Sequence, residues 1–201
     1  MGKIVVFTSL SLDGVMQAPG RPDEDRRDGF QRGGWAAPYA DEVTGSVAAE
    51  GMANTGGLLL GRRTYEDFYA YWPKQTDNPF TAVLNNTQKY VASTTLTQPL
   101  PWSNSTLLKA NVPALVRELK AQAGNDIVVL GSGKLVRSLM RHDLVDEFVL
   151  LIHPLVLGSG HRLFADDGGA FAELGLIDVK TTTTGVVIAK YQSPGPTATG
   201  Q

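Results

Sequence analysis

The stretch Ile127-Val-Val-Leu-Gly-Ser-Gly-Lys-Leu-Val-Arg-Ser-Leu-Met140 decides how the rest of this chain is interpreted. Its first four residues are apolar without polar alternation, which predicts a strand covered on both faces. From Lys134 onward the apolar residues recur at helical spacing. Between the two, Gly131 and Gly133 permit a tight turn and a close approach of the backbone to a ligand. Such a turn directs the free N–H groups of the helix start at one point, which favours binding of a phosphate group.

This motif alone leaves two interpretations open. It lacks the third glycine of the dinucleotide-binding fingerprint, because Val136 stands there. It also lacks the Lys-Ser/Thr ending of a P-loop, because Leu135 follows Lys134. A strand-to-helix turn that only requires a positive φ is therefore as well supported as a ligand site.

A second turn of the same kind favours the ligand site. The apolar run Gly57–Gly61 is followed directly by Arg62-Arg-Thr-Tyr-Glu-Asp-Phe68, which reads as a helix start. Two arginines in the first turn of a helix oppose its macrodipole, and a bound anion would offset that cost. Guanidinium groups also match the geometry of phosphate. We therefore weight anion binding above the alternative in which both arginines only extend into water.

Composition restricts the class of protein. The 201 residues suit one domain, over residues 1–192, and the Pro-, Gly-, Ser- and Thr-rich residues 193–201 are expected to form a disordered tail. A net charge of −2 without a Lys/Arg cluster gives no reason to expect nucleic acid as a partner. Without cysteine there is no disulfide or thiolate metal site, and the three histidines lack metal-ligand spacing, so no metal is expected. With no membrane-length apolar run or recognisable signal region, we expect no membrane association and, by default, a cytoplasmic location.

Strand and helix patterns alternate along the chain and end in a hairpin. Strands are predicted at Lys3–Leu10, Gly57–Gly61, Lys89–Thr95, Trp102–Leu108, Ile127–Leu130 and Glu147–Pro154, and helices at Asp41–Ala53, from Arg62, at Pro113–Ala123 and from Lys134. Val179–Tyr191 reads as an antiparallel hairpin around Gly185. The aromatic, proline-marked Tyr69–Leu84 is assigned to core or dimer packing. The predicted class is α/β, with a mostly parallel central sheet flanked by helices.

Two further residues have both a structural and a functional interpretation. Asp13 precedes Gly14 just after the first strand, so it either forms the turn through its own backbone or borders a site at the strand end. Trp35 lies in the long irregular segment Gln17–Tyr39 and is either an aromatic flap over a pocket or an anchor of this loop to the core. The commoner structural interpretation is favoured for both.

Hallmarks of nucleophilic catalysis are missing from the sequence. There is no Gly-x-Ser-x-Gly elbow and no obvious carboxylate pair for glycoside hydrolysis. Anion-binding turns without a nucleophile suit an enzyme whose cofactor supplies the chemistry.

Five segments in order resemble the dihydrofolate reductase-like superfamily, and more closely the stand-alone relatives of the RibD C-terminal reductase domain of riboflavin biosynthesis. They are Ser11–Val15 (SLDGV), Leu60–Glu66 (LGRRTYE), Lys89–Ser93 (KYVAS), Val129–Leu135 (VLGSGKL) and His153–Phe164 (HPLVLGSGHRLF). The likeness extends over about residues 3–191. The segments also follow one another in the order typical of the family, which makes the set specific although each motif is short. It implies a three-layer fold, with NADPH as the hydride donor.

The resemblance also implies roles for individual residues. It places Arg62 at the adenosine 2′-phosphate with Arg63 as a helper, and Thr64 at the pyrophosphate. The cofactor-binding set it implies is Gly61, Arg62, Arg63, Thr64, Ser93, Thr94, Gly131, Ser132, Gly133, Lys134 and Leu135. Asp13 becomes the candidate catalytic residue, which would orient the substrate or relay a proton. Trp35 and Tyr65 become candidates for substrate contact.

Two departures from the family pattern bear on the substrate. The carboxylate that holds the pterin ring in dihydrofolate reductases would fall near Gly45, so dihydrofolate is not favoured. The zinc-binding cysteines of a deaminase domain are absent, so a bifunctional role is excluded. The sequence therefore predicts an NADPH-dependent reductase of a small heterocyclic or carbonyl/imine substrate, similar to the aminopyrimidine reductase of riboflavin synthesis, and a homodimer. The alternative is an NADPH-binding module or sensor without turnover.

Overall fold

A computed structural model of the chain describes residues 2–164 and 171–194. The predicted tail, residues 193–201, begins with two described residues, and the backbone N–H of Ser193 donates to the carbonyl of Asp146 at 2.8 Å. Residues 195–201 lie outside the described part of the chain, so the disorder expected there stays a prediction.

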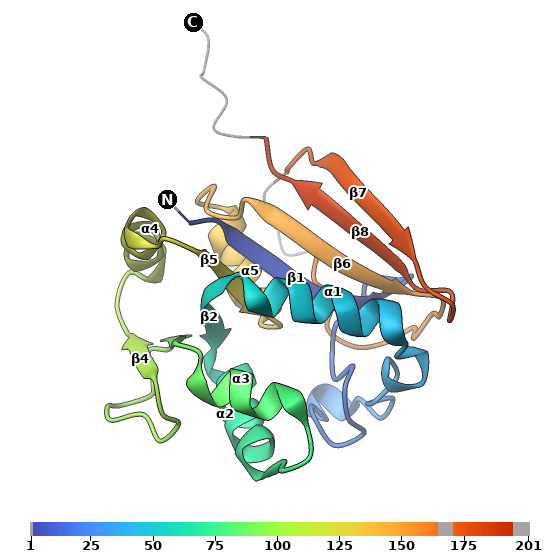
Figure 1. Cartoon of the computed structure of the whole chain (residues 1–201), viewed down its shortest axis with the longest axis horizontal. Helices are drawn as coiled ribbons and strands as arrows, with labels where there is room; N and C mark the ends of the chain where they lie inside the picture. The colour runs from blue at the N-terminus through green and yellow to red at the C-terminus, as the bar shows by residue number, and fades with distance from the viewer. Residues whose placement is uncertain (1, 165–170, 195–201) are drawn as a thin grey trace, which may run out of the picture.

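The centre of the fold is one mixed sheet of eight strands (Figure 1). The strands are β1 (Ile4–Ser11), β2 (Thr55–Gly61), β3 (Lys89–Ala92), β4 (Ser105–Leu108), β5 (Asp126–Leu130), β6 (Glu147–His153), β7 (Gly175–Thr181) and β8 (Val187–Gln192), in the spatial order β4-β3-β2-β5-β1-β6-β8-β7. The first six strands of this spatial order, from β4 through β6, pair in parallel. Strand β8 pairs antiparallel with both β6 and β7. The predicted fold class, a mostly parallel sheet with a C-terminal antiparallel hairpin, is confirmed.

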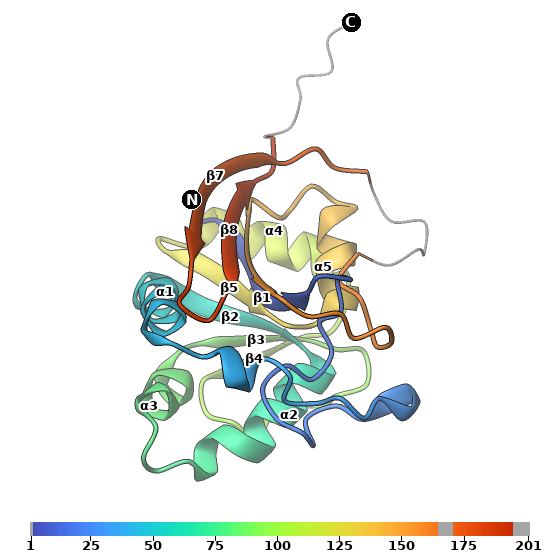
Figure 2. The ribbon, with the colours of Figure 1, turned by 90° about the vertical axis from the view of Figure 1, so that its right-hand side faces the viewer.

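Helices cover both faces of this sheet (Figure 2). They are α1 (Glu42–Ala53), α2 (Arg62–Tyr71), α3 (Pro79–Asn86), α4 (Val112–Gln122) and α5 (Gly133–Met140), with short 3₁₀ helices at Arg27–Gly29, Ala37–Tyr39 and Trp72–Lys74. Successive strand residues point to opposite faces. On one face, Ile4 and Val6 of β1 pack with buried residues of α4 and α5. On the other face, Phe7 lies among residues that pack with α1, α2 and α3.

Helix α3 lies inside the aromatic segment that was assigned only to packing. The Asn78 side chain accepts a hydrogen bond from the N–H of Phe80 at 3.0 Å, and Pro79 occupies the first helical position. Asparagine at the N-cap followed by proline is a recognised helix start. The sequence therefore contained the signal for α3, although the surrounding aromatic residues obscured it.

Lys89 fastens the end of α3 to the start of β3. Its side chain is fully buried, and Nζ donates to the carbonyl oxygens of Leu84, Asn85 and Thr87 at 2.7, 3.2 and 2.7 Å. Nζ also lies 4.5 Å from the ring centroid of Trp102. Burial lowers the pKa of Lys89 to about 8. At neutral pH the ammonium group is retained, and its charge complements the negative end of the helix dipole.

Helix α1 is well capped but poorly packed. Asp41 and Thr44 form a reciprocal capping box, and the Asp41 carboxylate also accepts from the backbone and hydroxyl of Thr183 in the β7–β8 turn. Nevertheless, no residue of α1 is buried. Its small residues, such as Gly45 and Gly51, do not fill the space toward the sheet, so the helix is held at its ends and leaves a cavity beneath it.

Candidate functional site

The predicted site residues follow strands whose carboxyl ends share one edge of the sheet. Strands β3, β2, β5, β1 and β6 are parallel neighbours in that order. The residues after them are Ser93–Thr94, Gly61–Thr64, Gly131–Leu135 and Asp13. The crevice outside the carboxyl ends of parallel strands is where ligands bind in open α/β sheets. The fold therefore brings these four segments, far apart in sequence, to the edge where a ligand site is expected.

Ser132 joins the two glycine turns. Its hydroxyl oxygen accepts a hydrogen bond from the N–H of Gly61 at 2.8 Å and shares another with the Thr64 hydroxyl, also at 2.8 Å. Ser132 and Gly131 have φ values of 62° and 59°, the left-handed conformation that turns β5 into α5. The starts of α2 and α5 are thereby held side by side, with their helix N-termini at the same sheet edge.

Glycine at two positions of these turns has a packing reason. A Cβ added to Gly61 would lie 2.8 Å from the Ser132 hydroxyl oxygen. A Cβ on Gly133 would lie 2.8 Å from the sulfur of Met16. Both contacts are closer than packed atoms tolerate. The glycines therefore let the turns approach each other and the Met16 segment, whether or not a ligand is bound.

Unpartnered cations stand at both helix starts. Arg63 on α2 and Lys134 on α5 are exposed, and neither makes a hydrogen bond or ion pair with any other described residue. Arg62 forms an exposed ion pair with Glu66 at 3.2 Å, one helical turn later. Free cations beside helix N-termini suit an anion with several charges, such as a group bearing more than one phosphate. The residues present therefore fit such a ligand.

The other predicted cofactor residues have more local roles. The Ser93 hydroxyl accepts from the N–H groups of Thr95 and Leu96 at 3.2 and 3.0 Å, so it organises its own turn. Thr94 is exposed at the end of β3. The side chain of Leu135 packs against the buried core, so only its backbone faces the turn.

The Asp13 side chain is held by hydrogen bonds from neighbouring residues. Its carboxylate accepts hydrogen bonds from the Ser11 hydroxyl at 2.7 Å and from the N–H groups of Leu157 and Gly158 at 3.0 and 2.9 Å. The Arg162 side chain donates to the Asp13 carbonyl at 2.8 Å. The Ser11 hydroxyl and then the Leu157 N–H are the main reasons why the pKa of Asp13 is lowered to about 2. This geometry supports the interpretation of Asp13 as the residue that shapes its turn.

Trp35 and Tyr65 both lie in packed interiors. The Trp35 indole N–H donates to the Gln17 carbonyl at 2.7 Å, and its ring meets the His153 ring edge-on with centroids 5.2 Å apart. Tyr65 is 1% exposed, and its hydroxyl accepts from the N–H of Trp102 at 3.0 Å. Trp35 thus anchors the long loop, and Tyr65 belongs to the core. The structure gives no support to the substrate contacts predicted for them.

A cavity of about 550 Å³ lies beneath α1, on the face of the sheet that α1, α2 and α3 cover. Its floor is formed by alternate residues of β1, β5, β6 and β8, and its walls by α1, α2, α3 and Trp72. The apolar lining consists of Val5, Phe7, Val47, Ala48, Met52, Phe68, Trp72, Phe80, Leu84, Val128, Leu130, Val149 and Ile188. Leu130 immediately precedes Gly131, so the cavity adjoins the glycine turn. No prediction from the sequence included this cavity, although the glycines and alanines of α1 were a signal for it.

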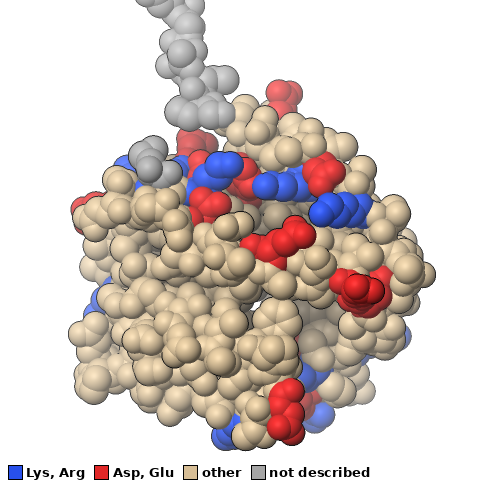
Figure 3. Space-filling model, in the orientation of Figure 1, with Lys and Arg blue, Asp and Glu red and all other residues tan. Residues whose placement is uncertain are grey.

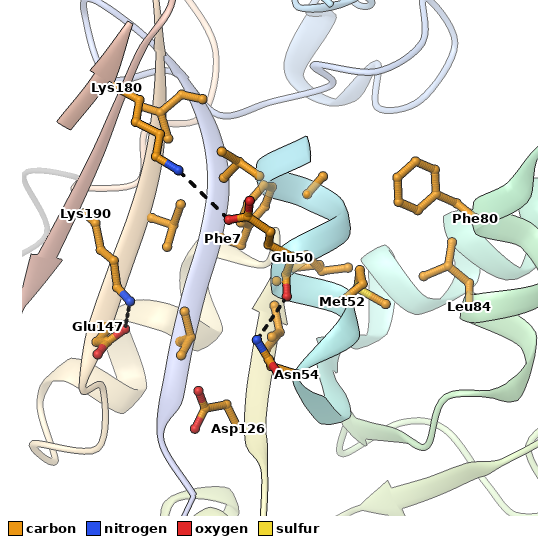
Figure 4. Close-up of a pocket in the computed structure, with 18 of the residues that line it drawn as sticks. Phe7, Glu50, Met52, Asn54, Phe80, Leu84, Asp126, Glu147, Lys180 and Lys190 are labelled. Atoms are coloured by element: carbon orange, nitrogen blue, oxygen red, sulfur yellow. Dashed lines mark hydrogen bonds and ion pairs between the residues drawn. The ribbon is translucent and has the colours of Figure 1, made fainter. Parts of the chain in front are cut away.

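Both lysines on the cavity lining are paired with glutamates of the same lining (Figure 4). Lys190 on β8 lies 2.7 Å from Glu147, and Lys180 on β7 lies 4.0 Å from Glu50 on α1. Burial acts to raise the pKa of Glu147, but the hydrogen bonds of Lys190 and Lys3 outweigh it and hold the pKa below its usual value. Over the face shown in Figure 3, both signs of charge intermix in the upper part and are sparse at the lower left, so no single-sign patch dominates it.

Residues 2–164 and 171–194 contain no sign of two other classes of site. None of the helices described there has the length and apolarity required to cross a membrane. Within the same ranges, no three His, Asp or Glu side chains converge as a metal site would require.

The sheet order, the helix layers and the ligand edge define a dihydrofolate reductase-like α/β fold. The chain belongs to the RibD C-terminal domain family, whose model matches residues 2–188. It is 32% identical over 142 residues to the uncharacterized protein YyaP of Bacillus subtilis (strain 168), covering 69% of this chain and 74% of YyaP.

Solved structures share the fold at low sequence identity. A proposed riboflavin biosynthesis protein of Shewanella sp. PV-4 superposes with a TM-score of 0.72 at 23% identity, covering 96% of this chain and 99% of that one. A diaminohydroxyphosphoribosylaminopyrimidine deaminase/5-amino-6-(5-phosphoribosylamino)uracil reductase of Thermotoga maritima gives a TM-score of 0.63 at 13% identity. The match covers 96% of this chain and 57% of the Thermotoga protein.

Proposed function

We propose that this protein is an NADPH-dependent reductase of a small heterocyclic or carbonyl/imine substrate. Membership of the RibD C-terminal domain family supports an oxidoreductase, because the related Thermotoga maritima protein is a deaminase and uracil-derivative reductase. The observation that supports the proposal most directly is local. Two helix N-termini, joined by Ser132, present Arg63 and Lys134 at one edge of the sheet, and neither side chain has a partner among the described residues.

The proposed binding mode assigns one part of the edge to each phosphate of the cofactor. Residues 131–134 and the start of α5 would hold the pyrophosphate through backbone N–H groups and Lys134. Arg62 and Arg63 would take the adenosine 2′-phosphate, with Ser93 and Thr94 along the ribose. Because Arg62 is already paired with Glu66, Arg63 is the less encumbered of the two arginines. NADPH, when bound, supplies a hydride for a carbonyl or imine carbon.

The proposed part of Asp13 is positional. With a pKa of about 2, its carboxyl group is deprotonated at neutral pH and cannot donate a proton. Its hydrogen bonds instead tie the turn after β1 to the loop after β6, at Leu157 and Gly158. Both segments border the ligand edge. The proton that completes a reduction is therefore assigned to solvent.

Nucleotide titration tests the proposal. Quenching of protein fluorescence is expected to show saturable, sub-millimolar NADPH binding, with NADH at least tenfold weaker because it lacks the 2′-phosphate. Arg63→Ala is expected to weaken NADPH binding about tenfold and to leave NADH binding unchanged, as expected for the loss of a phosphate-binding cation. Arg117→Ala, an exposed arginine on α4 at the opposite face of the sheet, is the matched control. No saturable NADPH binding would refute the proposal, and equal affinity for NADH would refute the role of the arginines.

A second candidate, an NADPH sensor without turnover, has one observation in its favour. Both glutamates on the cavity lining, Glu50 and Glu147, are in ion pairs, so neither is a ready proton donor. Binding of NADPH without its oxidation by any of a panel of pterins, pyrimidines and quinones would select this alternative.

The predicted homodimer is likewise part of the proposal. The edge strand β7 is exposed along its whole length, and Leu176, Ile177 and Val179 are 58%, 44% and 52% exposed. An apolar edge strand of this kind is a suitable surface for a second copy of the chain. Light scattering at micromolar concentration is expected to give twice the monomer mass. Val179→Lys is expected to reduce the measured mass to that of the monomer.

A further inference from the structure

We propose that the cavity beneath α1 takes an uncharged, planar, apolar group and does not admit a phosphate group. This inference rests on the proposed reductase function and names the class of molecule that the reductase would accept. Two features of the lining support it: its aromatic side chains and its excess of acidic over basic side chains.

The aromatic side chains come from both sides of the cavity. Phe7 lies on the sheet, whereas Phe68 and Phe80 come from α2 and α3. Trp72 follows α2 and packs edge-on against Phe68, with ring centroids 6.4 Å apart. Aromatic rings bind flat apolar molecules through offset-stacked and edge-to-face contacts. A volume of about 550 Å³ is within the range of small-molecule sites and accommodates two or three fused rings.

Charge on the lining opposes a phosphate group. Four lining residues are acidic, Glu50, Asp126, Glu147 and Asp178, and two are basic, Lys180 and Lys190, so the formal balance is 2 − 4 = −2. Both lysines are paired with glutamates of the same lining. A phosphate in the cavity would therefore lie among carboxylates without a free cation on the lining, which is electrostatically unfavourable. The unpartnered cations Arg63 and Lys134 are not among the lining residues, so they serve the sheet edge.

Calorimetric titration with three naphthalene derivatives tests the proposal on the full chain. Methyl naphthyl ketone has the ring and the carbonyl, ethylnaphthalene has the ring alone, and naphthoate replaces the ketone with an anion of similar size. The ketone and ethylnaphthalene are expected to bind within about threefold of each other, and both at least tenfold tighter than naphthoate. Absence of ketone binding, or naphthoate binding as tightly as the ketone, would overturn the proposal.

Two tryptophan substitutions on α1 locate the binding. Val47→Trp fills the cavity and is expected to weaken ketone binding at least tenfold. Ala49→Trp adds the same side chain at an exposed position outside the lining and is expected to leave it unchanged. NADPH binding is measured on the same samples and is expected to persist in both. Ketone binding that survives Val47→Trp overturns the cavity assignment. If the wild type binds the ketone but not NADPH, only the proposed function is refuted.

One further variant tests the role of charge. Glu147→Gln removes a carboxylate from the lining and leaves Lys190 without this partner, so it is expected to strengthen naphthoate binding at least tenfold. No gain for naphthoate in Glu147→Gln would contradict this step.

Discussion

Ser132→Ala is the substitution that most directly tests how the ligand edge is held together. The serine hydroxyl accepts from the N–H of Gly61 and shares a hydrogen bond with Thr64, both at 2.8 Å. Alanine removes both hydrogen bonds and leaves the Gly61 N–H without its acceptor. The link between the β2–α2 turn and the β5–α5 turn is then lost, whereas the strands themselves are untouched.

The expected magnitude follows from these contacts. Each hydrogen bond contributes a net of about 1 kcal/mol, so the free energy of unfolding is expected to fall by about 2 kcal/mol. For a chain of this size that corresponds to a Tm lower by about 4–8 °C. Ser132→Gly loses the same hydrogen bonds but relieves the φ of 62°. It is therefore expected to be about 1 kcal/mol less destabilised than Ser132→Ala.

Urea unfolding and NADPH titration measure the two consequences. The order of stability is expected to be wild type, Ser132→Gly and Ser132→Ala, and NADPH affinity is expected to fall at least tenfold in both variants because the turns lose their fixed relation. Ser46→Ala, an exposed serine on α1, serves as the control. Wild-type stability and wild-type NADPH affinity in Ser132→Ala would refute the reasoning that this hydroxyl joins the two turns.

Three other predictions concern side chains and backbone around this edge. Asp13→Asn places an amide NH₂ against the N–H of Leu157 or Gly158, so a lower Tm is expected at neutral pH. The pKa of Asp13 is about 2 in the folded protein and about 3.9 in the unfolded chain. The stabilisation by Asp13 is therefore complete above about pH 4 and disappears as the pH falls toward 2. A Tm difference between wild type and variant that stays constant over this range would contradict this prediction. Lys89→Met removes three hydrogen bonds to the end of α3 and is expected to lower the free energy of unfolding by about 2–3 kcal/mol, with faster hydrogen exchange confined to α3 and β3; protection equal to that of the wild type would count against the cap. Gly160→Ala combines a φ of 112° with a Cβ placed 2.8 Å from Phe30 and Val15, and is expected to cost about 2–4 kcal/mol in urea unfolding, whereas Gly158→Ala, with a φ of 74° and open space, is expected to cost about 1 kcal/mol; equal costs would show that the contacts do not matter.

Local patterns determined most of the elements. The apolar runs at Ile4–Phe7 and Ile127–Leu130 form strands because β-branched and aliphatic side chains suit a sheet covered on both sides. Asp41 begins α1 through its own side chain, as its position before an apolar-periodic stretch indicates. These outcomes depend on residues a few positions apart, so they can be read from the chain without knowing its path in space.

The family resemblance, rather than composition, implied the three-layer fold and the set of residues expected to bind the cofactor. The structure supplied the strand order, in which Gly61–Thr64 and Gly131–Leu135 follow neighbouring strands. The roles of individual residues in binding remain predictions, because the sequence identifies side-chain types but not their final partners.

Only the tertiary structure decided what these side chains contact. The Asp13 carboxylate finds its backbone donors at Leu157 and Gly158, 144 and 145 positions away, and the Ser132 hydroxyl meets Gly61 across 71 positions. The cavity beneath α1 likewise depends on how far a helix with small residues lies from four strands that are distant in sequence, β1, β5, β6 and β8. Hydrogen-bond partners and voids are set by the packing of elements remote in sequence. Local propensity depends only on neighbouring residues and cannot predict these contacts. The sequence therefore determined which helices and strands form, and the fold determined which of their side chains meet.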